Sequence, residues 1–150
     1  MANAGKAITA AGMLCGAMDI TAALVVHGQF GLRPQRLLQG IAAGLLGKSA
    51  FEGGWGTAAL GLILHFVIAL GAATVFYVAS RWMRFLVEQW GWWGPMYGVA
   101  VYFFMQMVVL PLSQTGRRPF SWKMTWIGIV IHIICVGTPI AWGVKSFENR

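Results

Sequence analysis

The stretch TAALGLILHFVIALGAATVFYVAS, residues 57–80, decides the fold of this chain. It contains no Asp, Glu, Lys or Arg. At about 1.5 Å per residue, an α-helix of this length crosses a hydrocarbon layer about 30 Å thick. Because such a helix satisfies its own backbone hydrogen bonds, the sequence predicts a membrane span here. Within it, the imidazole of His65 is the side chain that lipid tolerates least.

The composition of the whole chain agrees with a membrane protein. Of its 150 residues, 58% are hydrophobic and 10% are charged, whereas soluble domains average roughly 25% charged residues. The formal charge of +7 comes from basic residues that lie mostly in short segments between apolar runs. Charges at such positions set topology or contact anionic lipid headgroups. We therefore expect the lipid bilayer as a partner and no nucleic acid.

Three further apolar runs predict an all-α fold, an integral membrane four-helix bundle that forms a single domain over residues 1–150. The expected spans are residues 6–27, 57–80, 94–112 and 124–144. Four spans put both termini on one side of the membrane, but the basic residues divide almost evenly between the two faces, so the orientation stays open. Pro139 is expected to kink the last span.

A shorter amphipathic segment, residues 35–47, lies between the first two spans. It is too short to cross a bilayer, so we expect a short interfacial or re-entrant helix there. Apolar residues recur in it at helical spacing. This predicted stripe comprises Leu37, Leu38, Ile41, Leu45 and Leu46, with Arg36, Gln39 and Gly40 off the stripe.

The two halves of the chain share three short patterns in the same order. A Gly-x-x-x-Gly pair occurs at residues 12–16 and again at 94–98. A Gly-x-Arg-Pro turn follows at 31–34 and at 116–119, and Gly-x-x-x-His occurs at 61–65 and at 128–132. The patterns predict a possible tandem two-helix repeat in parallel orientation. The glycine pairs also favour close helix approach.

Every span carries a strongly polar side chain at a similar predicted depth. His65 and His132 each lie eight residues into spans that enter from the same face, about 12 Å deep at the helical rise. Asp19 lies eight residues before His27 at the end of span one, and Gln106 is slightly shallower in span three. Because polar groups in lipid face one another inside a bundle, we expect these five residues to form one intramembrane cluster.

Three interpretations of this cluster stay open. In the first, it is a structural hydrogen-bonded cluster that fixes the packing of the helices. In the second, His65 and His132, with Asp19 as a further candidate ligand, bind a divalent metal ion or a non-covalent haem in a redox protein. In the third, Asp19 serves in a transporter for protons or a small solute, with His27 nearer the mouth.

Other features of the sequence indicate a non-enzymatic protein. It has no phosphate loop, nucleophile elbow or hydrolytic constellation. The small size and the glycine pairs favour an accessory or structural subunit that packs against other membrane subunits or against itself. Four basic residues beside the turns are candidates for lipid headgroup contacts: Arg33, Arg36, Arg117 and Arg118.

Several short motifs carry a resemblance to a known group. LQGIA at residues 38–42, AFEGG at 50–54 and LHF at 64–66 resemble small bacterial four-span inner-membrane proteins of unassigned function. VLPLS at 109–113 and Ile131-His132 fit the same group, whose outline is similar to that of the YagU-like proteins. The resemblance implies a multi-pass protein of the bacterial inner (cytoplasmic) membrane, and it implies no reaction.

Overall fold

The chain is helical almost throughout in a computed structural model that describes residues 2–116 and 119–148. Within these residues, four helices are long and apolar enough to cross a membrane, which confirms the predicted all-α class. Arg117 and Arg118 lie outside the described residues. The first two are α1 (Ala2–Gln29) and α3 (Gly54–Trp82). The third is continuous over α5 (Trp90–Phe104), η2 (Met105–Val109) and α6 (Leu110–Leu112). The fourth is continuous over α7 (Trp122–Ile131), η3 (His132–Gly137) and α8 (Thr138–Glu148).

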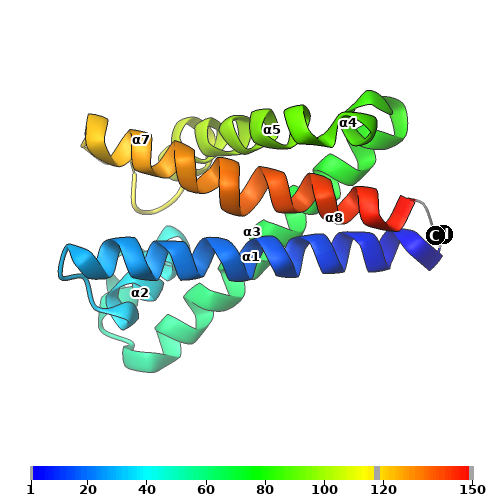
Figure 1. Cartoon of the computed structure of the whole chain (residues 1–150). Helices are drawn as coiled ribbons and strands as arrows, with labels where there is room; N and C mark the ends of the chain where they lie inside the picture. The colour runs from blue at the N-terminus through cyan, green and yellow to red at the C-terminus, as the bar shows by residue number, and fades with distance from the viewer. Residues whose placement is uncertain (1, 117–118, 149–150) are drawn as a thin grey trace.

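The long helices run back and forth between two ends of the molecule. α1 lies beside α7–α8 in the opposite direction, so the start of α1 and the end of α8 share one end (Figure 1). The short α4 (Phe85–Glu88) lies at this terminal end. The opposite end carries α2 (Pro34–Leu46) and η1 (Gly47–Phe51), and we call it the α2 end.

Glycines and other small residues let the long helices approach closely. A Cβ at Gly16 of α1 would lie 2.7 Å from the ring of Phe66 on α3, and one at Gly98 of α5 would meet the carbonyl oxygen of His132. The predicted close approach of both glycine pairs is therefore confirmed. The buried core combines alanines with a few larger apolar side chains such as Phe76 and Ile140: Ala11, Cys15, Ala69, Ala73, Phe76, Val136, Ile140 and Ala141.

α3 crosses the bundle obliquely, and this direction opens a wedge at the α2 end. The Tyr97 hydroxyl of α5 donates a hydrogen bond to the carbonyl oxygen of Ala72 on α3, at 2.7 Å, and ties the two helices together on the terminal side. From there α3 diverges from α5 toward the α2 end (Figure 1). The backbone N–H of Gln114 donates to the carbonyl oxygen of Gly44, at 2.9 Å, so α2 is joined to the segment after α6 at the wide side of this wedge.

The bounds of α2 agree with the predicted helix to within one residue, and its buried residues lie off the apolar stripe. They are Gln39, Ala42 and Ala43, whereas Leu45 of the stripe is 58% exposed. Alanines allow α2 to lie so close to α3 that a Cβ at Gly61 would meet the carbonyl oxygen of Leu38. The Gln39 amide is satisfied there because it donates to the carbonyl oxygen of Gly54 at 2.9 Å. Compact residues and one bonded amide therefore form the contact.

Two wide helical turns interrupt the third and fourth long helices. In η2 the backbone N–H of Leu110 bonds to the carbonyl oxygen of Met105, and in η3 that of Thr138 bonds to Ile133, each five residues earlier. A proline follows each turn, at Pro111 and Pro139. Since proline lacks an N–H and its ring crowds the preceding carbonyls, the backbone widens locally in place of the regular pattern. The irregularity expected at Pro139 thus takes the form of a π-turn.

Candidate functional site

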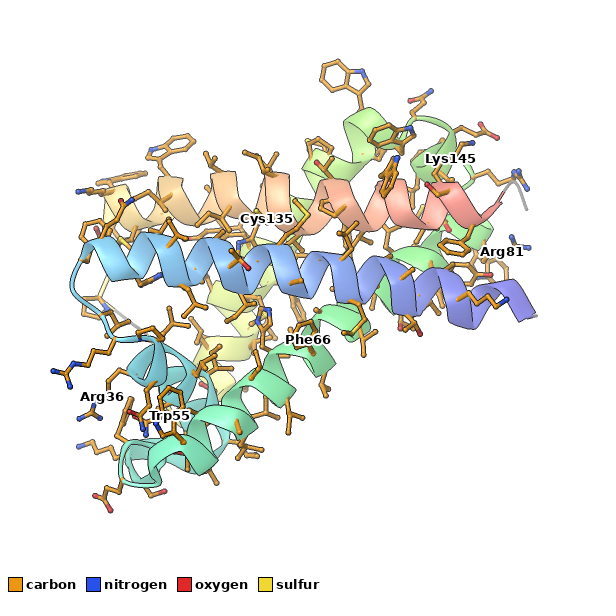
Figure 2. All side chains as sticks on the ribbon, turned by 60° about the horizontal axis from the view of Figure 1, so that its bottom comes forward. Arg36, Trp55, Phe66, Arg81, Cys135 and Lys145 are labelled. Atoms are coloured by element: carbon orange, nitrogen blue, oxygen red, sulfur yellow. The ribbon has the colours of Figure 1, made fainter. Side chains whose placement is uncertain are left out.

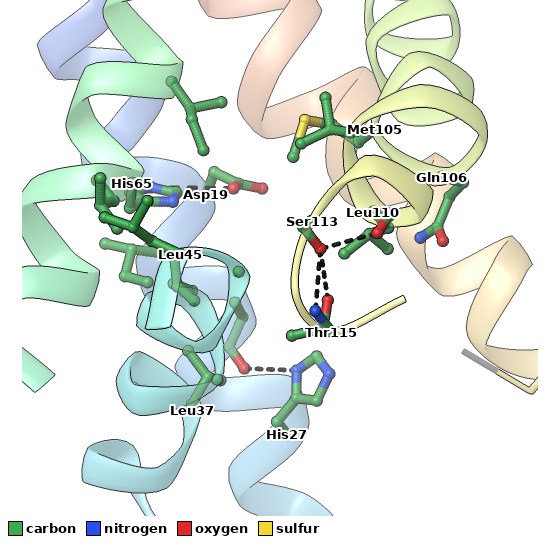
Figure 3. Close-up of a pocket in the computed structure, with 18 of the residues that line it drawn as sticks. Asp19, His27, Leu37, Leu45, His65, Met105, Gln106, Leu110, Ser113 and Thr115 are labelled. Atoms are coloured by element: carbon green, nitrogen blue, oxygen red, sulfur yellow. Dashed lines mark hydrogen bonds and ion pairs between the residues drawn. The ribbon is translucent and has the colours of Figure 1, made fainter. Parts of the chain in front are cut away.

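A cavity of about 850 Å³ occupies the wedge between the helices. Its walls come from α1, α2, α3, α5, η2 and η3, together with residues after α6 (Figure 3). Both wide turns therefore border it. Small-molecule sites in proteins have volumes of about 300–1,000 Å³, so the cavity has the size of a ligand-binding site.

The structure places all five residues of the predicted polar cluster on this one cavity. Asp19 and His27 come from α1, His65 from α3, Gln106 from η2 and His132 from η3. They include the three histidines of the chain and its single aspartate. Most other lining side chains are aliphatic, so the cavity combines a few polar groups with apolar walls.

Asp19 and His65 form the closest pair between two helices in the cluster. Oδ2 of Asp19 lies 4.0 Å from Nε2 of His65, and the two side chains are 20% and 13% exposed. The same Nε2 donates a hydrogen bond to the carbonyl oxygen of Gly16 at 2.9 Å. His65 thus ties α3 to the backbone of α1. Among residues 2–116 and 119–148, no described hydrogen bond reaches the Asp19 carboxylate. The carboxylate lines the cavity, where a ligand or water can donate hydrogen bonds to it.

His27 and His132 are held by their own helices. Nδ1 of His27 donates to the carbonyl oxygen of Ala23, and Nδ1 of His132 donates to that of Gly128, both at 2.9 Å. The ring of Tyr102 packs edge-on against the His132 ring, with centroids 5.3 Å apart. A carbonyl oxygen only accepts hydrogen bonds, so each Nδ1 carries hydrogen, and in the neutral ring Nε2 is left as an acceptor.

Gln106 lines the cavity but does not pair with Asp19, contrary to the expectation that the cluster is bonded within itself. It is exposed and lies across the cavity from Asp19 and His65 (Figure 3). Counting residues from the end of the span gave the height of Gln106 along the bundle. The height does not determine the direction in which a side chain leaves its helix. Gln106 is a residue of the cavity margin.

The basic candidates have different surroundings. Arg36 lines the cavity, and its guanidinium carbon lies 5.2 Å from the centroid of the Phe51 ring, a cation–π contact. Arg33 directly precedes α2 and is exposed. Arg117 and Arg118 lie outside the described part of the chain. Of the two candidates that the structure describes, Arg33 and Arg36, it brings Arg36 to the cavity.

Sequence reasoning missed several lining residues. Tyr102 is four residues before Gln106 and therefore on the same helix face, which was an available signal. Ser113 and Thr115 also line the cavity, and their hydroxyl oxygens are 2.7 Å apart. Their position depends on where the chain turns after α6, and no periodic pattern in the sequence reports that.

The donor set does not match a metal site held by three or more protein ligands. Among residues 2–116 and 119–148, no three His, Cys, Asp or Glu side chains are grouped so that they could hold a metal ion. The Nε2 of His65, the usual ligating atom, is directed at the Gly16 carbonyl. Asp19 and His65 alone would supply two ligands, fewer than the three or four protein ligands typical of zinc. The geometry therefore does not favour a divalent metal ion bound by Asp19 and His65, and haem binding stays a prediction.

Comparison with models of protein families, with curated proteins and with solved structures found no match. The class of the protein rests on its own features. It is a helical bundle with four helices, in the described residues, of membrane-spanning length and apolarity. Between them lies a cavity lined mainly by aliphatic side chains, with one aspartate, three histidines and a few further polar residues among them.

Proposed function

We propose that this protein is a non-enzymatic, multi-pass membrane protein that binds a small amphipathic molecule in its cavity. One observation carries the proposal: a cavity of about 850 Å³ gathers the single aspartate and all three histidines of the chain among mostly aliphatic side chains. Sites for small molecules typically combine apolar walls with a few convergent polar groups.

The exterior of the bundle supports insertion in a membrane. Large apolar side chains such as Val67 and Val75 of α3 are 58% and 61% exposed, and in water such surfaces cause aggregation. Arg36 and Trp55 lie at one end of the bundle, and Arg81 and Lys145 lie at the other (Figure 2). Charged and tryptophan side chains at both ends suit the two membrane–water interfaces. The resemblance noted in the sequence would make this the bacterial inner membrane.

The open lone pairs favour binding over a purely structural cluster. A structural cluster would satisfy its polar groups within itself. Here His65 bonds to the Gly16 backbone, and His27 and His132 bond within their own helices. The Asp19 carboxylate lines open space beside them. Water or a ligand is needed to complete this arrangement.

The packing of the glycine pairs supports a tandem repeat. Gly12 and Gly16 of α1 lie against α3, and Gly94 and Gly98 of α5 lie against η3 and α8. In each half, the first long helix therefore packs its glycine pair on the next one. We propose that the two halves are related helix pairs, with α2 as an addition to the first half.

The experiment fills the cavity by substituting a lining glycine that has room for a side chain. Gly40 lines the cavity on α2, and a Cβ there meets no heavy atom within 4 Å. Gly71 on α3 is equally open but is exposed and is not a lining residue, which makes it the matched control. The probe is N-phenyl-1-naphthylamine, whose fluorescence rises in apolar sites, titrated into the purified protein in amphipol.

We expect saturable binding of about one probe per chain. Gly40→Trp should weaken it about tenfold or more, because overpacking costs about 1–3 kcal/mol, whereas Gly71→Trp should leave it unchanged. Equal binding by Gly40→Trp and the natural chain, or no saturable component at all, would overturn the proposal. The expected roles as an accessory subunit and as a transporter stay predictions, and both are compatible with a bound ligand.

A further inference from the structure

Asp19 and the three histidines bring hydrogen-bond acceptors to the cavity lining. Nδ1 of His27 and of His132 and Nε2 of His65 already donate to backbone carbonyl oxygens. In the neutral rings, the other nitrogen of each is a lone-pair acceptor. The Asp19 carboxylate accepts through both of its oxygens. A ligand that pairs with these groups must therefore donate hydrogen bonds.

The Asp19 carboxylate also needs positive charge. A half-buried carboxylate beside apolar walls is costly without a counter-ion. Its neighbour His65 lies at 4.0 Å and uses the nearest N–H for Gly16. Arg36 is the one Lys or Arg among the described lining residues, and it lies over the Phe51 ring. The charge that Asp19 lacks is one that a ligand can supply.

The apolar walls define the rest of the ligand. Ile20 of α1, Ile41 and Leu45 of α2, and Leu64 and Ile68 of α3 contribute aliphatic surface to the cavity. Such surface accepts a hydrocarbon or aromatic body and gains about 25 cal/mol for each Å² removed from water. A small inorganic cation would leave these walls unused.

We propose that the ligand of this cavity is an organic cation, an ammonium group that carries an apolar body. Its N–H groups donate to the Asp19 carboxylate, and its body lies against the aliphatic walls. This inference rests on the proposed function, because it names the ligand class of the same cavity.

The test compares two probes of nearly equal shape, 1-naphthylmethylammonium and the uncharged 1-naphthylmethanol. Each displaces N-phenyl-1-naphthylamine from the protein in amphipol at neutral pH. The variant is Asp19→Asn, which keeps the size of the side chain and removes its charge. Asp19→Glu restores the carboxylate. Glu88→Gln makes the same acid-to-amide change at an exposed site far from the cavity lining.

We expect the ammonium probe to bind the natural chain more tightly than the alcohol. Asp19→Asn should weaken the ammonium about tenfold or more, since hydrogen bonds to charged groups contribute about 1.5–3 kcal/mol, and should change the alcohol by no more than about twofold. Asp19→Glu and Glu88→Gln should retain the preference. Because the alcohol reports on the same cavity, unchanged binding of the alcohol shows that Asp19→Asn is folded.

The outcomes separate this inference from the proposed function. If the cavity binds N-phenyl-1-naphthylamine but the ammonium is no tighter than the alcohol, or Asp19→Asn weakens both equally, the cation assignment is overturned and ligand binding stands. If N-phenyl-1-naphthylamine shows no binding that Gly40→Trp weakens, the proposed function itself fails.

Discussion

At the scale of single residues, the three histidines differ in which ring nitrogen carries hydrogen. His27 and His132 donate through Nδ1 to carbonyl oxygens four residues earlier in their own helices. His65 donates through Nε2 to Gly16 on another helix. These contacts leave one acceptor nitrogen in each neutral ring, and all three rings line the cavity.

This difference gives a prediction about the neutral imidazoles. In their neutral forms, His27 and His132 should be Nδ1–H tautomers and His65 should be the Nε2–H tautomer. Nitrogen-15 NMR of histidine-labelled protein distinguishes the two forms, and single His→Gln variants assign the signals. Three identical tautomers, or rapid averaging in all three rings, would contradict the hydrogen bonds described above.

The sequence predicted which polar residues meet but not all of their partners. Counting residues from the ends of the apolar runs places Asp19 and His65 at similar heights, and the structure brings them to 4.0 Å. The same count suggested a contact for Gln106, which lies at the cavity margin. An isolated polar residue in an apolar helix has a predictable height, but its direction depends on how the helices cross.

At the scale of elements, the long helices were predictable because few structures other than a membrane-spanning helix accommodate such long apolar runs. The span predicted at residues 57–80 is α3, Gly54–Trp82, which extends slightly further at both ends. The packing face of α2 was not predictable. An apolar stripe on a helix indicates contact with something apolar, and cavity walls or lipid satisfy that condition as well as a core does.

The close helix contacts give a stability prediction. A Cβ at Gly98 would meet the carbonyl oxygen of His132 and lie 2.9 Å from the Cα of Ile133, whereas one at Gly71 meets nothing within 4 Å. Gly98→Ala should therefore lower the free energy of unfolding by about 1–3 kcal/mol through overpacking. Gly71→Ala should be neutral or stabilising by up to about 1 kcal/mol, because alanine favours helix.

Unfolding by graded addition of a denaturing detergent, followed by circular dichroism, measures both variants. The comparison is internal because each change adds one methyl group to a long helix. Equal stability of Gly98→Ala and Gly71→Ala would show that α5 and η3 are not in the described contact.

At the scale of the whole molecule, the cavity follows from the direction of α3. The Tyr97–Ala72 hydrogen bond holds α3 against α5 on the terminal side, and the divergence toward the α2 end leaves the space that α2 partly fills. No local pattern in the sequence encodes this divergence. It depends on where glycines and other small residues let two helices approach closely, as Gly61 of α3 does against the backbone of Leu38 on α2.

The central claim is that three histidines from three helical segments and one aspartate line a single cavity that binds a cation. The most direct measurement is a titration of histidine-labelled protein with 1-naphthylmethylammonium, followed by nitrogen-15 NMR. We predict that the signals of His27, His65 and His132 shift together with one common dissociation constant, and that Asp19→Asn raises this constant for all three. Signals that shift with unrelated constants, or that stay fixed while the probe binds, would contradict a shared site.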